Sequence, residues 1–232
     1  MLQRRPLFAG LVLALATLVS VLWIDRPLAL FFAQFHLGHA VFTNPSLTLP
    51  VMIVIAWAGV LTGAGFLVAR RPMPRWIEAG MLAGIALLAS LWLTHEVLKP
   101  IFGRSVPSLL IQRGQYGFHW FHHGHPFGSF PSGHTDQAAA ILTVAWLYFP
   151  RWRWVYLGLL GLLALALMLG QWHFLGDILA GAMVGAGAGA GALAVRLWRV
   201  ARGGAGRWRP SAWGRAGSLA KDVRLQPSQQ EE

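Results

Sequence analysis

The sequence predicts an all-α, polytopic membrane protein with six transmembrane helices. Of its 232 residues, 56% are hydrophobic and only 12% are charged, whereas soluble domains carry roughly 25% charged residues. The mean hydropathy is +0.53. Six apolar runs follow one another, and most of them approach the ~20 residues that a helix needs to cross the hydrocarbon core. We therefore expect one membrane-embedded helical domain over residues 1–198.

The six runs give the expected helices in order. They cover about residues 7–24, 49–69, 76–98, 134–149, 154–172 and 178–195. The first run follows Arg4 and Arg5, as in a signal peptide, but it is longer than a usual signal core and ends without a small-residue cleavage site. We interpret it as a retained helix. The fourth run is short, as expected for a helix that begins at a site recessed from the membrane surface.

The basic residues give the orientation. If the N-terminus is cytoplasmic, the cytoplasmic segments hold 15 of the 19 lysines and arginines. Only Arg26, Lys99, Arg104 and Arg113 fall on the opposite side. Because cytoplasmic loops of membrane proteins carry such an excess, we expect both termini inside and the 99–133 connection outside. Topology then accounts for the net charge of +11, and no nucleic-acid partner is predicted.

Three segments lie outside these helices. Residues 25–48 hold an apolar stretch with His36 and His39, which predicts a short interfacial helix at the outer surface. The 99–133 connection is the longest polar one, and loops of that length usually carry function. Residues 199–232 turn basic and then polar, as is typical of a disordered cytoplasmic tail. The chain has no cysteine, which excludes disulfides and thiolate metal ligands.

The last helix carries glycines at regular spacing. Gly181, Gly185 and Gly189 are four residues apart and therefore share one helix face. Small residues let membrane helices approach closely. The pattern favours packing within the bundle over dimerisation, and the oligomeric state stays open.

Polar residues gather at the outer ends of helices three to six. They are Lys99, Arg104, Ser132, Gly133, His134, His173 and Asp177. The predicted topology brings all of them to one face of the membrane, in one layer. Ionisable residues at this depth are costly and therefore indicate function.

These residue types suit the binding of a phosphate. Lys99 and Arg104 supply the cations that a phosphate dianion needs. The start of the fourth helix offers unpaired N–H groups and a positive dipole end, together with the Ser132 hydroxyl. Gly133 has no side chain to hold the phosphate away from the backbone.

The two histidines suit phosphoryl chemistry. A neutral His173 is a competent nucleophile at phosphorus, and Asp177, one helical turn further on, can fix its tautomer. His134 can protonate the leaving oxygen. Positioning and charge would stabilise the transition state, so neither a metal nor another cofactor is predicted.

Structural alternatives exist for each motif taken alone. Ser132 can cap a helix without any substrate, and a histidine four residues before an aspartate is often structural. Their occurrence together with Lys99 favours a site. We interpret His95-Glu96 as an interfacial polar pair and Asp136 as a residue that bonds within the bundle.

The 99–133 connection also contains a histidine cluster, His119, His122, His123 and His125. A metal site there is one alternative, although a closed zinc site is poorly specified because no carboxylate accompanies the histidines. A wet loop that lines the substrate entrance is the other alternative.

Over about residues 95–185 the chain resembles the type-2 phosphatidic acid phosphatase (PAP2) superfamily, whose core is related to vanadium haloperoxidases. Lys99 matches the first-motif lysine, Pro131-Ser132-Gly133-His134 is intact, and His173 to Gly181 matches the end of the third motif. The resemblance implies a PAP2/haloperoxidase-like helical core in the cytoplasmic (inner) membrane, with the site facing the periplasm or exterior. It also implies metal-independent hydrolysis of a lipid phosphate through a phosphohistidine on His173, with His134 as general acid. Phosphatidic acid, phosphatidylglycerol phosphate, polyprenyl pyrophosphate and lipid A are the implied substrate classes.

Two family arginines are absent, because their positions hold Val106 and Leu167. We expect Arg104 to replace the first, and Arg113 or a histidine of residues 119–125 to replace the second. Two alternatives to hydrolysis stay open. One is phosphate transfer between lipids by the same histidines, and the other is an anion-binding membrane protein with weakened catalysis.

Overall fold

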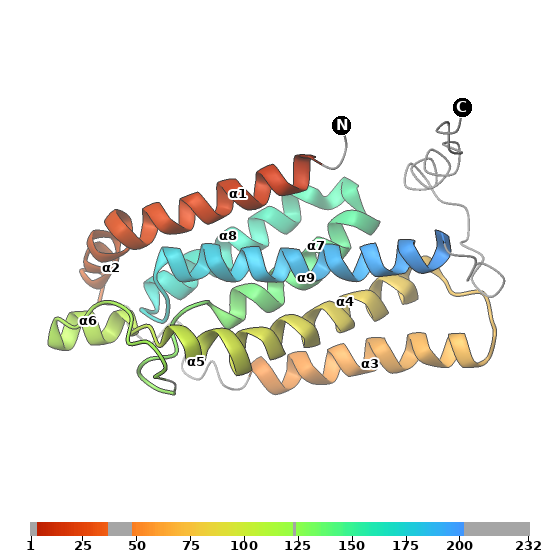
Figure 1. Cartoon of the computed structure of the whole chain (residues 1–232), viewed down its shortest axis with the longest axis horizontal. Helices are drawn as coiled ribbons and strands as arrows, with labels where there is room; N and C mark the ends of the chain where they lie inside the picture. Colours follow the sequence, from red (N-terminus) through yellow and green to blue (C-terminus); the bar gives the residue numbers. More distant parts are fainter. Residues whose placement is uncertain (1–3, 37–47, 123, 202–232) are drawn as a thin grey trace, which may run out of the picture.

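The computed structural model describes residues 4–36, 48–122 and 124–201. Within these residues the chain forms a bundle of long helices and no β-strand (Figure 1), which confirms the all-α prediction. Five described helices are long and apolar enough to cross a membrane: Phe8–Ala33, Leu49–Val68, Arg75–Phe102, Pro150–Leu169 and Leu175–Trp198. The chain is therefore a multi-pass helical membrane protein.

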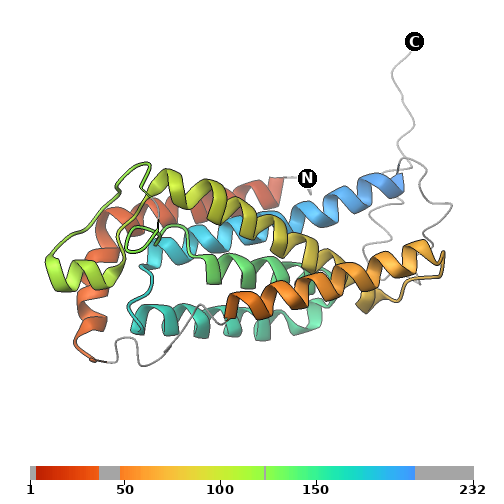
Figure 2. The same ribbon diagram turned by 90° about the horizontal axis from the view of Figure 1, so that it is seen from below.

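The first span is longer than its apolar run. Helix α1 (Arg4–Val19) continues through a π-helical turn (Ser20–Ile24) into α2 (Asp25–Ala33). The expected interfacial helix is thus continuous with the first helix, and it turns across the end of the bundle (Figure 2). His39, which we placed in the same segment, lies outside the described residues.

The next helices lead to the polar connection. Helix α3 (Thr48–Val68) is followed by α4 (Arg75–Trp92), which continues through a π-helical segment (Leu93–Leu98) into α5 (Lys99–Phe102). Helix α6 (Pro107–Arg113) follows and ends at Gly114, where φ is +68°. The long connection therefore contains two short helices that its polar composition did not predict.

The central helix is α7 (Gly133–Tyr148). Its 16 residues span only about 24 Å at 1.5 Å per residue, so it is not among the five long spans. It packs against α4 and α9 (Leu175–Ala201), and α8 (Arg153–Leu169) follows it. The fourth predicted helix thus exists and occupies the middle of the bundle, while its crossing of the membrane stays a prediction.

Glycine explains how closely α7 and α9 approach. A Cβ atom at Gly181 or Gly185 would overlap the carbonyl oxygen of Ser132 or Asp136, and one at Gly189 would lie 2.8 Å from the Ala140 carbonyl. All three carbonyls belong to α7 or its cap. The predicted glycine face therefore packs within the bundle.

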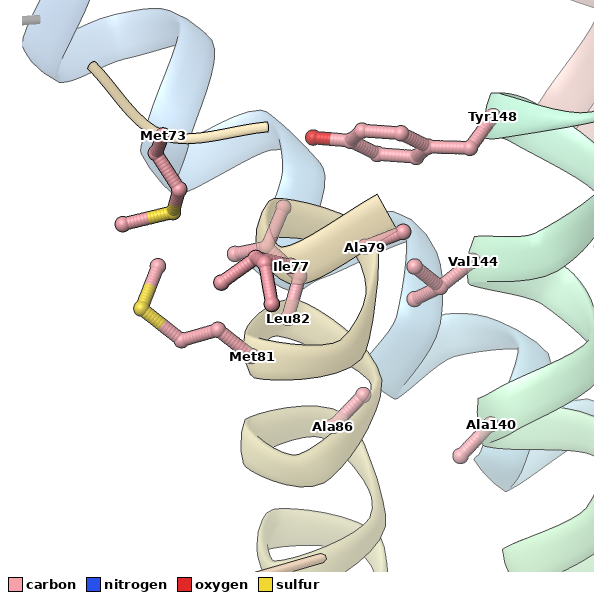
Figure 3. Packing of buried hydrophobic residues seen from close by; sticks show 9 residues of the cluster. All are labelled: Met73, Ile77, Ala79, Met81, Leu82, Ala86, Ala140, Val144 and Tyr148. Carbon is pink, nitrogen blue, oxygen red and sulfur yellow. The ribbon is translucent and has the colours of Figure 1, made fainter. Parts of the chain in front are cut away.

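A hydrophobic cluster lies at the end of the bundle that is opposite to α5. Its buried members, drawn in Figure 3, are Met73, Ile77, Ala79, Met81, Leu82, Ala86, Ala140, Val144 and Tyr148. Beside it, the guanidinium of Arg196 pairs with Glu78, and both side chains are buried. Lipid tails are as apolar as the side chains of the hydrophobic cluster. Close packing rather than hydrophobic burial therefore stabilises the cluster in a membrane.

Candidate active site

The start of α7 is tied to the start of α9. Ser132 is the N-cap residue, and its Oγ accepts hydrogen bonds from the Thr135 backbone N–H at 3.4 Å and the Thr135 hydroxyl at 3.0 Å. The Ser132 backbone N–H donates to the Asp177 carbonyl at 2.9 Å. The capping role is therefore present, and the same bonds fix the Pro131-Ser132-Gly133-His134 turn against Asp177.

His173 lies in the short connection between α8 and α9, with only 7% of the residue exposed. Its Nδ1 is 2.9 Å from the Ser129 carbonyl oxygen. Because a carbonyl can only accept, Nδ1 carries the proton, and Nε2 of the neutral ring keeps its lone pair. The backbone thus fixes the tautomer that a nucleophilic Nε2 requires.

Asp177 is fully buried one helical turn after His173. Its Oδ2 accepts from the Ser129 hydroxyl at 2.6 Å and from the Phe174 N–H at 2.8 Å. The same oxygen lies 3.7 Å from Nδ1 of His173, which is too long for a hydrogen bond. The side chains of His173 and Asp177 therefore make no direct hydrogen bond. Asp177 instead accepts hydrogen bonds from Ser129, whose carbonyl oxygen contacts the ring, and from Phe174, the residue after His173.

Arg104 is also fully buried. Its guanidinium donates to Asp177 at 2.6 Å, to Asp25 at 2.7 Å and to the Tyr116 hydroxyl at 2.8 Å. Burial alone would lower the pKa of Arg104, but the charges of Asp177 and Asp25 outweigh it and raise that pKa. The structure thus places Arg104 beside carboxylates, a different environment from the one expected of a phosphate ligand.

Lys99 and His95 face the start of α7. A Cβ atom on Gly133 would lie 2.8 Å from Nε2 of His95 and 3.7 Å from Nζ of Lys99. His95 therefore lies at the start of α7, whereas Glu96 is exposed, and the interpretation of the two as an interfacial pair stays a prediction.

The two histidines of the motifs approach each other across this space. The ring centroids of His134 and His173 are 6.2 Å apart. His134 directly follows Gly133 in the chain, and Lys99 and His95 approach the position where a Gly133 side chain would be. The structure thus brings together Lys99, Ser132, Gly133, His134, His173 and Asp177.

The residues proposed to replace the missing family arginines lie elsewhere. Arg113 is exposed at the end of α6, and Leu167 is buried. The rings of His119 and His122 pack at steep angles against Phe127, with ring centroids at 4.7 Å and 6.0 Å from it. His123 lies outside the described residues, and within the described part no three His, Asp or Glu side chains are grouped as metal ligands.

Sequence reasoning missed three residues near the site. Asp25 is an ionisable residue within an apolar span, and that signal alone marks a functional or structural role. His95 precedes Lys99 by four residues, a spacing that shares one face in an α-helix, but the segment Leu93–Leu98 between them is π-helical. Ser129 lies in a loop, and nothing in the sequence distinguishes it.

Comparison with known proteins agrees with this geometry. The family model of the PAP2 superfamily matches residues 79–201, so the chain belongs to this superfamily. Lipid A 1-phosphatase of Rhizobium johnstonii is 31% identical over 94 residues, which cover 40% of this chain and 38% of that protein. Lipid A 1-phosphatase of Rhizobium etli is 28% identical over 110 residues, covering 47% of this chain and 46% of that protein. The matches thus span less than half of either relative, and no solved structure matches the chain.

Proposed function

We propose that the protein hydrolyses a phosphate monoester or pyrophosphate on a membrane lipid, without a metal, through a phosphohistidine on His173. The observation that carries this proposal is the pairing of two histidine rings 6.2 Å apart at the start of a helix. The Nδ1–H bond of His173 to a backbone carbonyl supports Nε2 as the nucleophile.

The phosphate would bind over Gly133. There the backbone at the start of α7 and the helix dipole attract an anion, and Gly133 itself adds no side chain. Lys99 adds a positive charge, and His95 adds a ring nitrogen at the same place. We infer that these two side chains take over phosphate contacts that the family assigns to the arginines absent at Val106 and Leu167.

The reaction would proceed in two displacements. In the first, Nε2 of His173 attacks phosphorus, the bond from phosphorus to the leaving oxygen breaks, and His134 donates a proton to that oxygen. In the second, His134 takes a proton from water, whose oxygen attacks the phosphohistidine and releases inorganic phosphate. Asp177 would act throughout by holding the Ser129 and Phe174 groups on either side of the His173 ring.

The substrate is expected to be a lipid phosphate. Both relatives are lipid A 1-phosphatases, so lipid A 1-phosphate heads the candidates, followed by phosphatidic acid, phosphatidylglycerol phosphate and polyprenyl pyrophosphate. We expect the purified protein in detergent to release inorganic phosphate from at least one of these lipids with a chelator present. Loss of all activity in chelator, restored by a divalent metal, would contradict the metal-independent mechanism.

The same assay separates hydrolysis from phosphate transfer. In ¹⁸O-labelled water, hydrolysis places the label in the released phosphate, whereas transfer places the phosphate on an acceptor lipid and leaves it unlabelled. No phosphate release and no transfer from any of the four lipids would favour the anion-binding alternative.

We further propose that the site faces the periplasm or exterior. The support is the 15-to-4 distribution of basic residues between the two sides of the predicted topology. Topology reporters fused after residue 73 and after residue 115 are expected to respond inside and outside, respectively. A residue-115 fusion that is active only in the cytoplasm would place the site on the inner face.

A further inference from the structure

A buried ion triad joins the first span to the start of α9. The Arg104 guanidinium lies between the carboxylates of Asp25 and Asp177, at 2.7 Å and 2.6 Å, and all three side chains have 0% exposure. Asp25 comes from α2, whereas Asp177 lies in the first turn of α9. The triad therefore joins segments that are far apart in the sequence.

Every oxygen of the two carboxylates is satisfied. Oδ1 of Asp25 accepts from the Ser20 hydroxyl at 2.6 Å and from the Gly176 backbone N–H at 2.8 Å. The Tyr116 hydroxyl, which accepts from Arg104, donates in turn to the Val21 carbonyl at 2.6 Å. Buried charges are expected to be paired and hydrogen-bonded in this way, and of the Arg104 guanidinium only Nε has no hydrogen-bond partner within the described residues.

This network holds the backbone on the C-terminal side of His173. The Phe174 N–H donates to Asp177 and the Gly176 N–H donates to Asp25, each at 2.8 Å. A Cβ atom on Gly176 would lie 2.7 Å from Oδ2 of Asp25, so only glycine permits this approach. The position of the His173 ring thus depends on a carboxylate from another helix.

We propose that Asp25 and Arg104 are positioning residues, which fix His173 through Asp177 and the first turn of α9. Asp25 lies outside residues 79–201, the part of the chain that matches the family model. The first span would therefore complete the site. The inference rests on the proposed function of His173, and it gives Arg104 a role other than direct phosphate contact.

The test compares two buried ion pairs at opposite ends of the bundle. Asp25→Asn removes one charge of the triad and leaves a neutral Arg104–Asp177 pair, so the protein is expected to fold. Glu78→Gln removes the carboxylate of the buried pair with Arg196 and is the matched control. We expect both variants to unfold at lower temperature, while only Asp25→Asn lowers kcat, by about 10- to 100-fold with little change in KM, because misplacement of a reacting group costs about this much.

A second measurement does not depend on activity. Ring ¹⁵N chemical shifts of His173 in histidine-labelled protein, assigned with His173→Ala, are expected to move in Asp25→Asn and to stay unchanged in Glu78→Gln. Unchanged shifts in Asp25→Asn would overturn the positioning role even if the wild-type protein releases phosphate. If His173 shifts as expected but the wild type hydrolyses none of the lipids, the proposed function fails while the positioning role holds.

Arg104→Lys separates the two roles of Arg104. A positioning role predicts lower kcat, since an ammonium group cannot bridge both carboxylates as the planar guanidinium does. A tenfold rise in KM with unchanged kcat would instead show direct contact with the phosphate and would overturn the proposal.

Discussion

Replacing His173 with alanine is expected to lower turnover by more than about a thousandfold, because no covalent intermediate can form without the nucleophile. The loss should be equal for an aryl phosphate and a lipid phosphate, since both substrates need the same attack on phosphorus. Phosphate release is measured for both substrates at saturating concentration. His36→Ala, an exposed histidine beyond α2, is the control and should retain wild-type turnover.

His134→Ala should behave differently from His173→Ala. A general acid contributes about 10²- to 10⁴-fold when the leaving group is poor, as the alkoxide of a lipid is. An aryl phosphate has a good leaving group, so its turnover should fall by no more than about tenfold. If His134→Ala instead loses both substrates equally, while His173→Ala retains the aryl phosphate, the two roles are reversed.

Replacing Gly185 with alanine is expected to destabilise the protein by about 3 kcal/mol or more. The added Cβ would overlap the Asp136 carbonyl and lie 2.8 Å from the Ala140 backbone nitrogen. These are backbone atoms of α7, so they cannot move aside as a flexible side chain would. The helices α7 and α9 would have to separate, and with them the rings of His134 and His173.

Gly187→Ala is the matched control for this change. A Cβ at Gly187 meets no atom within 4 Å, and alanine favours a helix by about 1 kcal/mol over glycine. Thermal unfolding in detergent should therefore show a large decrease for Gly185→Ala and none for Gly187→Ala. Equal midpoints for the two variants would mean that the contact between α7 and α9 is not close in the folded protein.

Much of the fold could be predicted because its signals are local. The length of an apolar run sets the length of a helix, and five of the six predicted runs are among the helices long enough to span a membrane. The glycine spacing in α9 identified its packing face for the same reason. The boundaries were less predictable: the run at 178–195 belongs to a helix that extends over Leu175–Ala201, since polar residues at a helix end do not stop it.

The candidate site was predictable only in part. Pro131-Ser132-Gly133-His134 and His173 were identified because a helix start near an ionisable residue has a recognisable sequence pattern. His95 was missed because it was interpreted together with its neighbour Glu96. Only Glu96 is exposed, and a π-helical segment runs through both residues. A π-helical segment changes which residues share a face, and no pattern in the sequence predicted it.

By itself the sequence determined an all-α membrane protein and the order of its helices, and it predicted the residues that we propose for phosphate chemistry. The tertiary structure alone decided the partners of those residues. Arg104 is separated from Asp177 by 73 residues and from Asp25 by 79, yet the three meet in one buried network. A buried guanidinium must have carboxylates around it, but which carboxylates reach it depends on how α2 and α9 pack together.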